Sequence, residues 1–337
     1  MQATRKDVAK MAGVSTATVS YVLNGSKNVS EETASRVMKA VNRLEYRPNM
    51  IARSMSTNKS MQLSIVVENI GNPFFGEIIH GFEDSANNNG YFVNICDGFN
   101  KLDSYFDNFI ARRVDGVFVT AMPNRFNVEK LYRLVEKDIN IVVSGNVDVN
   151  MKLVSSIEND HITAMKDVFE YLYGLGHRNI AYLSGLGRNQ KNDRRIEGYL
   201  AMIDKYGLAY GDDLLFDGKA PYSTDVPDGY RLACDLMESK RKFTAVICLN
   251  DLMAMGASNA LQERGYRIPE DVSLVGFDGI PFTEYWNPPL TTMAMERYAF
   301  GQKAFQLLYA NITDGTTGFY LNKLRLVERK STAPCNR

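Results

Sequence analysis

The sequence predicts a small all-α head containing a helix-turn-helix, followed by a larger α/β region of doubly wound parallel sheets. Three observations predict it. The stretch KDVAKMAGVSTATVSYVLNG near the start has helical spacing but too few apolar residues for a core of its own. From residue 62 onward, short apolar runs alternate with amphipathic segments. The charge is also divided unevenly between these two parts.

Length and composition indicate a globular protein with more than one domain. The chain has 337 residues and a 45% share of apolar residues. No run of eighteen apolar residues is present, and the first residues lack the apolar core of a secretory signal, so we expect a cytoplasmic protein. Four scattered cysteines and three histidines argue against a metal site, and no cofactor is expected.

Positive and negative charges are distributed unevenly along the chain. Residues 1–60 carry ten basic and four acidic side chains, a net charge of +6, and the rest of the neutral chain therefore carries −6. A basic head on an acidic body favours an anionic partner for the head alone. A solvated basic face without a partner is the alternative.

The head is predicted to begin with two crossing helices. Val8, Ala9 and Ala12 lie at helical spacing, and Gly13 can end that helix in a left-handed conformation. Ser15 can cap a second helix whose inward stripe includes Val19. The outward face carries short, neutral side chains and one phenol, namely Thr16, Ala17, Ser20 and Tyr21. Such a face suits close approach to base edges, which a generic three-helix bundle would not explain.

Two further segments complete the head. Ser30 can start a third helix with an apolar face that includes Val37 and Leu44. Residues 48–56 follow, where Pro48 suits the first turn of a helix too short to be stable alone in water. The run from DVAKMAGVSTATVSYVLNG through VSEETASRVMKAVNRLEYRPNMIARSM resembles the DNA-binding head of the lactose/galactose repressor (LacI/GalR) family across about 58 residues.

The remainder alternates predicted strands and helices. We expect strands at 62–68, 91–97, 116–122, 140–145, 179–185, 245–251 and 272–278. Ligands of parallel sheets bind at the carboxyl ends of the strands. The polar and aromatic residues near these ends are Phe74, Phe75, Arg195, Asn250, Asp251 and Asp278. An arginine, an amide and carboxylates beside aromatic walls suit the binding of hydroxyl groups, although each residue alone could be a loop cap or a surface ion pair.

The motifs NPFFGEI, RRVDGV, LGHRNIAYLSG, NDLMAMG, DVSLVGFDGIP and PPLTT occur in the order of the same family. The resemblance therefore covers nearly the whole chain and implies an effector domain like a periplasmic sugar-binding protein, with two subdomains. It implies a DNA-binding head at 1–58 with a hinge helix at about 48–56, and an effector-binding and dimerisation domain at 61–337. The subdomains would span about 61–160 with 293–325, and about 161–292 with 326–337.

The resemblance also implies site residues. For DNA they are Thr4, Arg5, Lys6, Ser15, Thr16, Ala17, Thr18, Ser20, Tyr21, Asn24, Ser30, Thr33, Tyr46, Asn49, Arg53 and Met55. For the effector they are Phe74, Phe75, Arg195, Tyr222, Asn250, Asp251 and Asp278. Met55 would be the apolar wedge that the hinge helix inserts into the DNA minor groove.

This chain departs from the family pattern at several places. The predicted recognition helix lacks the arginine or glutamine common on its outer face, so the operator sequence cannot be transferred. Gly145 and Asn146 replace a usual acidic residue, and Arg297 replaces an apolar one and is expected to add charge to the pocket. The C-terminal STAPCNR has no heptad tail for tetramerisation.

The expected protein is a homodimeric transcriptional repressor that binds a near-palindromic double-stranded operator and responds to a small effector, a sugar or sugar derivative. The effector could equally act as a co-repressor, and a sugar-binding module with a fused head is a second alternative. An enzyme is disfavoured because GxSxG, HExxH and GxxxxGK[ST] motifs are absent from the sequence.

Overall fold

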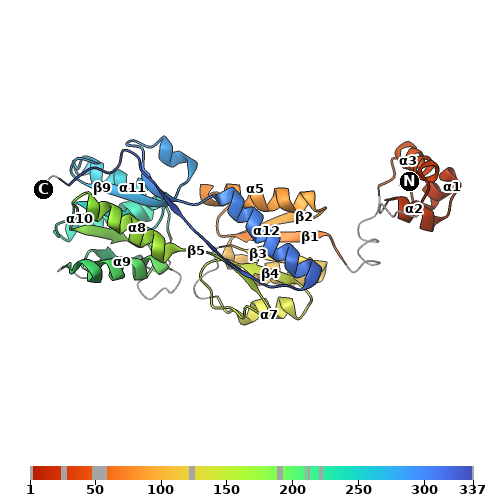
Figure 1. Cartoon of the computed structure of the whole chain (residues 1–337), viewed down its shortest axis with the longest axis horizontal. Coiled ribbons are helices and arrows are strands. Elements are labelled where there is room, and N and C mark those ends of the chain that lie inside the picture. The colour runs from red at the N-terminus through yellow and green to blue at the C-terminus, as the bar shows by residue number, and fades with distance from the viewer. Residues whose placement is uncertain are drawn as a thin grey trace. The chain divides into compact units, whose positions relative to one another are not determined.

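The computed structural model describes residues 3–23, 29–47, 59–120, 126–187, 193–208, 210, 213–219 and 223–335. The chain divides into two compact units, Met1–Ser60 and Met61–Arg337, which are described separately below (Figure 1). Among the described residues, no helix combines the length and apolar character needed to span a membrane.

The first unit is a three-helix head made of α1 (Arg5–Ala12), α2 (Thr16–Leu23) and α3 (Glu31–Arg43). Gly13 ends α1 with φ of +65°, a conformation in which glycine carries no Cβ penalty. Val8, Val19 and Val37, one from each helix, are fully buried and form the centre of a small core. The head is therefore the predicted helix-turn-helix with a third supporting helix.

The second unit contains two lobes, each built on a six-stranded sheet of described residues. The first sheet has the order β11-β5-β4-β3-β1-β2, and every pair in it is parallel. Its strands are β1 (Gln62–Val67), β2 (Phe92–Asp97), β3 (Gly116–Val119), β4 (Asn140–Val143), β5 (Ser155–Asn159) and β11 (Phe319–Asn322). Its helices are α5 (Pro73–Asn88), η1 (Phe99–Lys101), α6 (Leu102–Arg112), α7 (Glu129–Val135) and α12 (Arg297–Asp314). We call this the first lobe.

The second lobe has the sheet order β12-β10-β9-β8-β6-β7, parallel except for the antiparallel pair of β10 and β12. Its strands are β6 (Ile180–Leu183), β7 (Leu215–Phe216), β8 (Ala245–Cys248), β9 (Ser273–Asp278), β10 (Thr291–Ala294) and β12 (Arg325–Val327). Its helices are α8 (His161–Gly174), α9 (Arg194–Tyr206), α10 (Val226–Glu238), α11 (Asp251–Glu263) and η2 (Pro281–Glu284). Strands buried on both faces explain why the sequence shows continuous apolar runs rather than alternation.

Three segments connect the lobes: β5 to α8, β10 to α12, and β11 to β12, the last visible as the dark blue diagonal in Figure 1. Asn159 contacts both of the other connections. Its side-chain amide donates to the Met295 sulfur at 3.4 Å, and its oxygen accepts from Asn322 at 2.8 Å. The three connections are therefore held to one another by side chains as well as by their strands.

The predicted fold class is confirmed, with differences at the strand ends. The apolar pattern extends one predicted strand to residue 251, but in the structure Asn250 caps α11 and Asp251 is its first residue. The strands β5, β7, β10, β11 and β12 have no counterpart among the predicted strands. The predicted hinge helix at 48–56 lies outside the described residues.

Candidate nucleic-acid interface and effector site

The exposed face of α2 carries the residues predicted to contact bases. Thr16, Ala17 and Tyr21 are exposed, and Tyr21 keeps 53% of its surface accessible. Ser20 is half-buried, and its hydroxyl donates to the carbonyl oxygen of Thr16 at 3.2 Å. The face is thus short and neutral, with one aromatic hydroxyl that projects beyond the backbone.

Three other predicted DNA contacts act as helix caps in the head. Thr4 and Asp7 form a capping box at the start of α1. The hydroxyl oxygens of Ser15 and Ser30 accept the backbone N–H groups of Thr18 and Thr33, at 3.1 and 3.4 Å. These bonds orient the amino ends of the helices, which carry partial positive charge and favour phosphate nearby.

The other predicted DNA contacts differ in exposure. Lys6 is exposed and Arg5 is half-buried on α1. Tyr46, by contrast, is 8% exposed and belongs to the core of the head, so packing holds its ring. Asn24, Asn49, Arg53 and Met55 lie outside the described residues.

Arg195 is the centre of a buried polar cluster in the second lobe. The residue is 7% exposed, at the first turn of α9, and its guanidinium lies 5.0 Å from the Phe277 ring centre. Asp193 is 3.6 Å away and also accepts bonds from Tyr182 and Ser184 at 2.8 Å each. Burial raises the pKa of Asp193, and the Arg195 charge and these hydroxyls oppose that shift.

His161, which the sequence interpretation did not include, lies directly against Arg195. Its Nε2 is 3.0 Å from Nη2 of Arg195. Because a guanidinium has only donors, Nε2 must accept, and the ring proton is on Nδ1. Within the described part of the chain, that Nδ1–H has no hydrogen-bond partner. Burial, together with the charges of Arg195 and Arg194, holds the pKa of His161 well below its ordinary value.

Asp278 ends β9 beside this cluster. Its φ is +98°, which is unusual for any residue except glycine. Burial raises the pKa of Asp278 to about 6, against the opposing charges of Arg195 and Arg297. The charges of Arg195 and Arg297 therefore both act on Asp278 in the structure, and effector contact by Arg195 and Asp278 stays a prediction.

Asn250 and Asp251 have partners within the second lobe. Asn250 caps α11 through the Met253 N–H and donates its amide to the Thr224 carbonyl at 2.9 Å. Asp251 is fully buried and accepts from the Ile280 N–H at 2.9 Å and the Thr292 hydroxyl at 2.6 Å. Burial and the neighbouring Asp278 raise the pKa of Asp251 well above its ordinary value. Both residues support the site structurally, and direct effector contact by them stays a prediction.

The two aromatic candidates that the structure describes, Phe74 and Phe75, differ in burial. Phe75 is buried in the core of the first lobe, and half-buried Phe74 lies edge-on to it at 5.0 Å. Tyr222 lies outside the described residues.

Gly145 and Asn146 donate their backbone N–H groups to Glu158 at 2.9 and 2.8 Å. A buried carboxylate thus lies beside the segment where the family often has an acidic residue.

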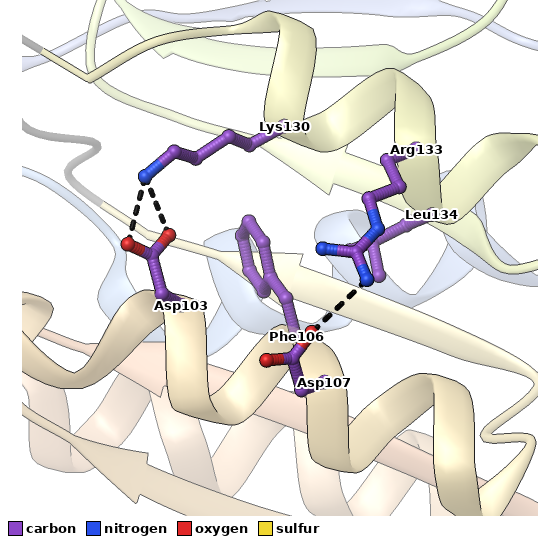
Figure 2. Close-up of a pocket in the computed structure, with 6 residues that line it drawn as sticks. All are labelled: Asp103, Phe106, Asp107, Lys130, Arg133 and Leu134. Atoms are coloured by element: carbon purple, nitrogen blue, oxygen red, sulfur yellow. Dashed lines mark hydrogen bonds and ion pairs between the residues drawn. The ribbon is translucent and has the colours of Figure 1, made fainter.

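A separate surface pocket of about 310 Å³ lies between α6 and α7 of the first lobe (Figure 2). Phe106 lies between two cross-helix ion pairs, Lys130 with Asp103 at 2.6 Å and Arg133 with Asp107 at 3.2 Å. Both cations are already paired, and none of the predicted effector residues lines this pocket. Among the described residues, no group of three or more His, Cys, Asp or Glu side chains could hold a metal ion.

A helix-turn-helix head joined to a two-lobed α/β domain defines a ligand-responsive transcription regulator. Two family models match the chain: "Bacterial regulatory proteins, lacI family" over residues 4–49, and "Periplasmic binding proteins and sugar binding domain of LacI family" over residues 60–332. The chain belongs to the LacI family of bacterial transcriptional regulators. It is a regulator and not an enzyme.

Relatives of nearly the same length support this assignment. The chain is 35% identical to the HTH-type transcriptional repressor PurR of Vibrio campbellii, with 93% of this chain and 92% of the relative covered. It is 33% identical to PurR of Mannheimia succiniciproducens, with 92% of each covered. The solved CelR–cellobiose complex is 26% identical with a TM-score of 0.73, covering 98% of this chain and 99% of the other. The lac repressor dimer bound to operator and the anti-inducer ONPF, 24% identical with a TM-score of 0.84, shows the same fold over 99% of this chain and 100% of the other.

Proposed function

We propose that the head binds a near-palindromic operator as one half of a homodimeric, cytoplasmic repressor. The observation that supports this best is the exposed face of α2, where Thr16 and Ala17 present short, neutral groups and Tyr21 presents a single phenol on a basic head. Such a helix can enter the major groove, because long side chains do not hold it away from the bases. Phosphate contacts would come from basic residues such as Lys6 and from the capped helix ends.

The DNA proposal is tested by selecting sequences from a random duplex library and measuring affinity by fluorescence anisotropy. We expect a palindromic consensus and a steep fall of affinity with salt, because two basic heads release counterions from the duplex. A shuffled duplex of the same composition is the control. Equal affinity for consensus and shuffled duplex at physiological salt would refute sequence-specific binding.

The second part of the proposal concerns the effector. We infer that a small polyhydroxylated molecule, a sugar or sugar derivative, binds between subdomains spanning about 61–160 with 293–325 and about 161–292 with 326–337. Arg195 would donate to its oxygens and Asp278 would accept from its hydroxyls, while Phe74 would cover its C–H surface. These groups lie at or near the carboxyl ends of strands, where ligands of parallel sheets bind.

A thermal-shift screen of a sugar panel that includes ribose and cellobiose tests this part. A ligand at ~100 times its Kd stabilises the native state by roughly 2.7 kcal/mol, which raises the unfolding temperature measurably. For any sugar that shifts wild type, Arg195→Ala should abolish the shift and leave operator affinity unchanged. Arg267→Ala is the matched control, because that arginine is exposed and pairs with Asp271. Retention of the shift in Arg195→Ala would remove Arg195 from the site.

Dimerisation is supported by exposed apolar side chains on the edge strand of the first sheet. Phe92 and Ile95 of β2 are 68% and 47% exposed. An unpaired edge with exposed apolar residues is suited to covering by a second copy of the chain. Light scattering should give twice the chain mass, and Phe92→Lys should weaken the dimer. A monomer at micromolar concentration would contradict the proposal.

A further inference from the structure

The turn that carries the Asp278 carboxylate has two consecutive residues with positive φ. Asp278 has φ of +98° and Gly279 has +67°. A Cβ on Gly279 would lie 2.5 Å from the Cβ of Ala294, so the turn also approaches β10 too closely for a side chain. A non-glycine residue stays in such a conformation only where its surroundings hold it there.

Arg297 supplies part of that support. Its guanidinium is buried, with 6% of the residue exposed, and Nη1 donates to the carbonyl oxygens of Asp278 at 2.8 Å and Gly279 at 2.5 Å. The Gly279 and Ile280 N–H groups are bonded within the second lobe, to Thr292 and Asp251. The two carbonyls of the turn are thus held by a residue that begins α12, the helix covering the first lobe.

The same guanidinium also contacts α5. Its Nη2 lies 2.9 Å from a carboxylate oxygen of Glu77, whose side chain is half exposed. Helices α5 and α12 lie side by side (Figure 1). Their backbones touch, since a Cβ on Gly81 would lie 2.0 Å from the Tyr298 carbonyl oxygen. One side chain therefore bonds both to the β9 turn of the second lobe and to the helix pair of the first.

We propose that Arg297 is a positioning residue that holds the Asp278–Gly279 turn in shape and, through Glu77, couples that turn to α5. The inference rests on the proposed function only in assigning Asp278 to the effector. A guanidinium suits this task because its planar fork donates in several directions at once, whereas an ammonium is a point charge. Movement of the turn when an effector binds would then be transmitted to α5 of the other lobe.

Hydrogen exchange of the full-length, ligand-free protein tests the coupling. The reporters are the Gly279 and Ile280 amides, because both are hydrogen-bonded and both lie in the second lobe, whereas Glu77 belongs to the first. Glu77→Gln removes one charge from the first lobe. We expect exchange of these two amides to become about fivefold faster. This factor corresponds to the free energy that a partly exposed ion pair contributes. Arg297→Lys should accelerate exchange more, because the fork is removed as well.

Glu296→Gln is the matched control, since Glu296 precedes Arg297 and pairs with exposed Arg325 at 3.1 Å instead. It should leave both amides unchanged. In the double variant, Glu77→Gln should have a smaller effect than it has in the wild-type background, because the fork that joins Glu77 to the turn is already absent. Unchanged exchange in Glu77→Gln, or equal acceleration in Glu296→Gln, would overturn the proposal. If Arg297→Lys fails to fold, Glu77→Gln decides alone. No DNA or effector is used, so failure here is separate from failure of the proposed function.

Discussion

The side chains of Arg195 and His161 lie 3.0 Å apart, and that contact fixes the imidazole as a neutral acceptor at Nε2. A protonated ring would place a second positive charge against the guanidinium, in a buried setting. The contact therefore orients the Arg195 guanidinium and fixes the tautomer of His161. The pH dependence of the second lobe should therefore include contributions of opposite sign from His161, whose pKa is lowered, and Asp278, whose pKa is raised.

The first prediction concerns His161. Its pKa is lowered in the folded protein, so below about pH 6.5 the unfolded chain binds a proton that the native state does not. The free energy of unfolding should therefore fall as pH decreases below that value. Urea unfolding at several pH values should show that His161→Gln loses less stability than wild type between pH 7 and 5. Parallel curves for the two proteins would contradict a buried neutral His161.

The second prediction concerns Asp278, where the sign is reversed. Its pKa is raised from 3.8 to about 6, so between these values the native state binds more protons than the unfolded chain. The contribution of Asp278 is present in full below pH 3.8 and is lost as pH rises through 6. Relative to Asp278→Asn, wild type should lose stability from pH 4 to 6 and show no further change above 7. A constant difference across that range would contradict the raised pKa.

Sequence pattern predicted most of the fold, but several contacts of the candidate site could not be predicted from it. The helix ends at Gly13 and Ser30 could be predicted because caps are local chemistry. Strand β5 could not, since its residues SSIEN lack an apolar run and become buried through pairing with β4 and β11. Strands that depend on such distant partners leave little local signal.

The difference between local signals and long-range contacts also applies to single residues. Arg195 and Asp278 followed from their positions near strand ends, but His161 begins the helix after β5 and had no motif to indicate it. Its contact with Arg195 spans 34 residues of sequence. The internal bonds of Asp251 to Thr292 and Ile280 were equally invisible, because a buried carboxylate and an effector contact look alike in sequence.

The third prediction separates base reading from phosphate binding in the head. Tyr21 is exposed on α2, so Tyr21→Ala should fold normally and change the preferred sequence, at about 1–3 kcal/mol per base pair read. Lys6→Ala should weaken all duplexes about equally and lower the salt slope by about one for each phosphate charge that is no longer neutralised. Anisotropy titrations on a set of single-base operator variants would measure both. Equal losses on every variant for Tyr21→Ala would refute its base contact.

The last prediction concerns Met55, which lies outside the described residues. The family resemblance predicts a hinge helix at residues 48–56, which would be too short to be stable alone and would fold only with DNA and its dimer partner. An apolar side chain inserted between central base pairs kinks the duplex, at a cost of a few kcal/mol that additional protein–DNA contacts offset. Met55→Ser should therefore weaken operator binding and reduce the bend measured by circular-permutation gel shift. Binding of any sugar to the DNA-free protein should not change, because the proposed effector site belongs to the other unit of the chain. If both bend and affinity stay as in wild type, the segment is a passive linker, and coupling between effector and operator must pass through the dimer instead.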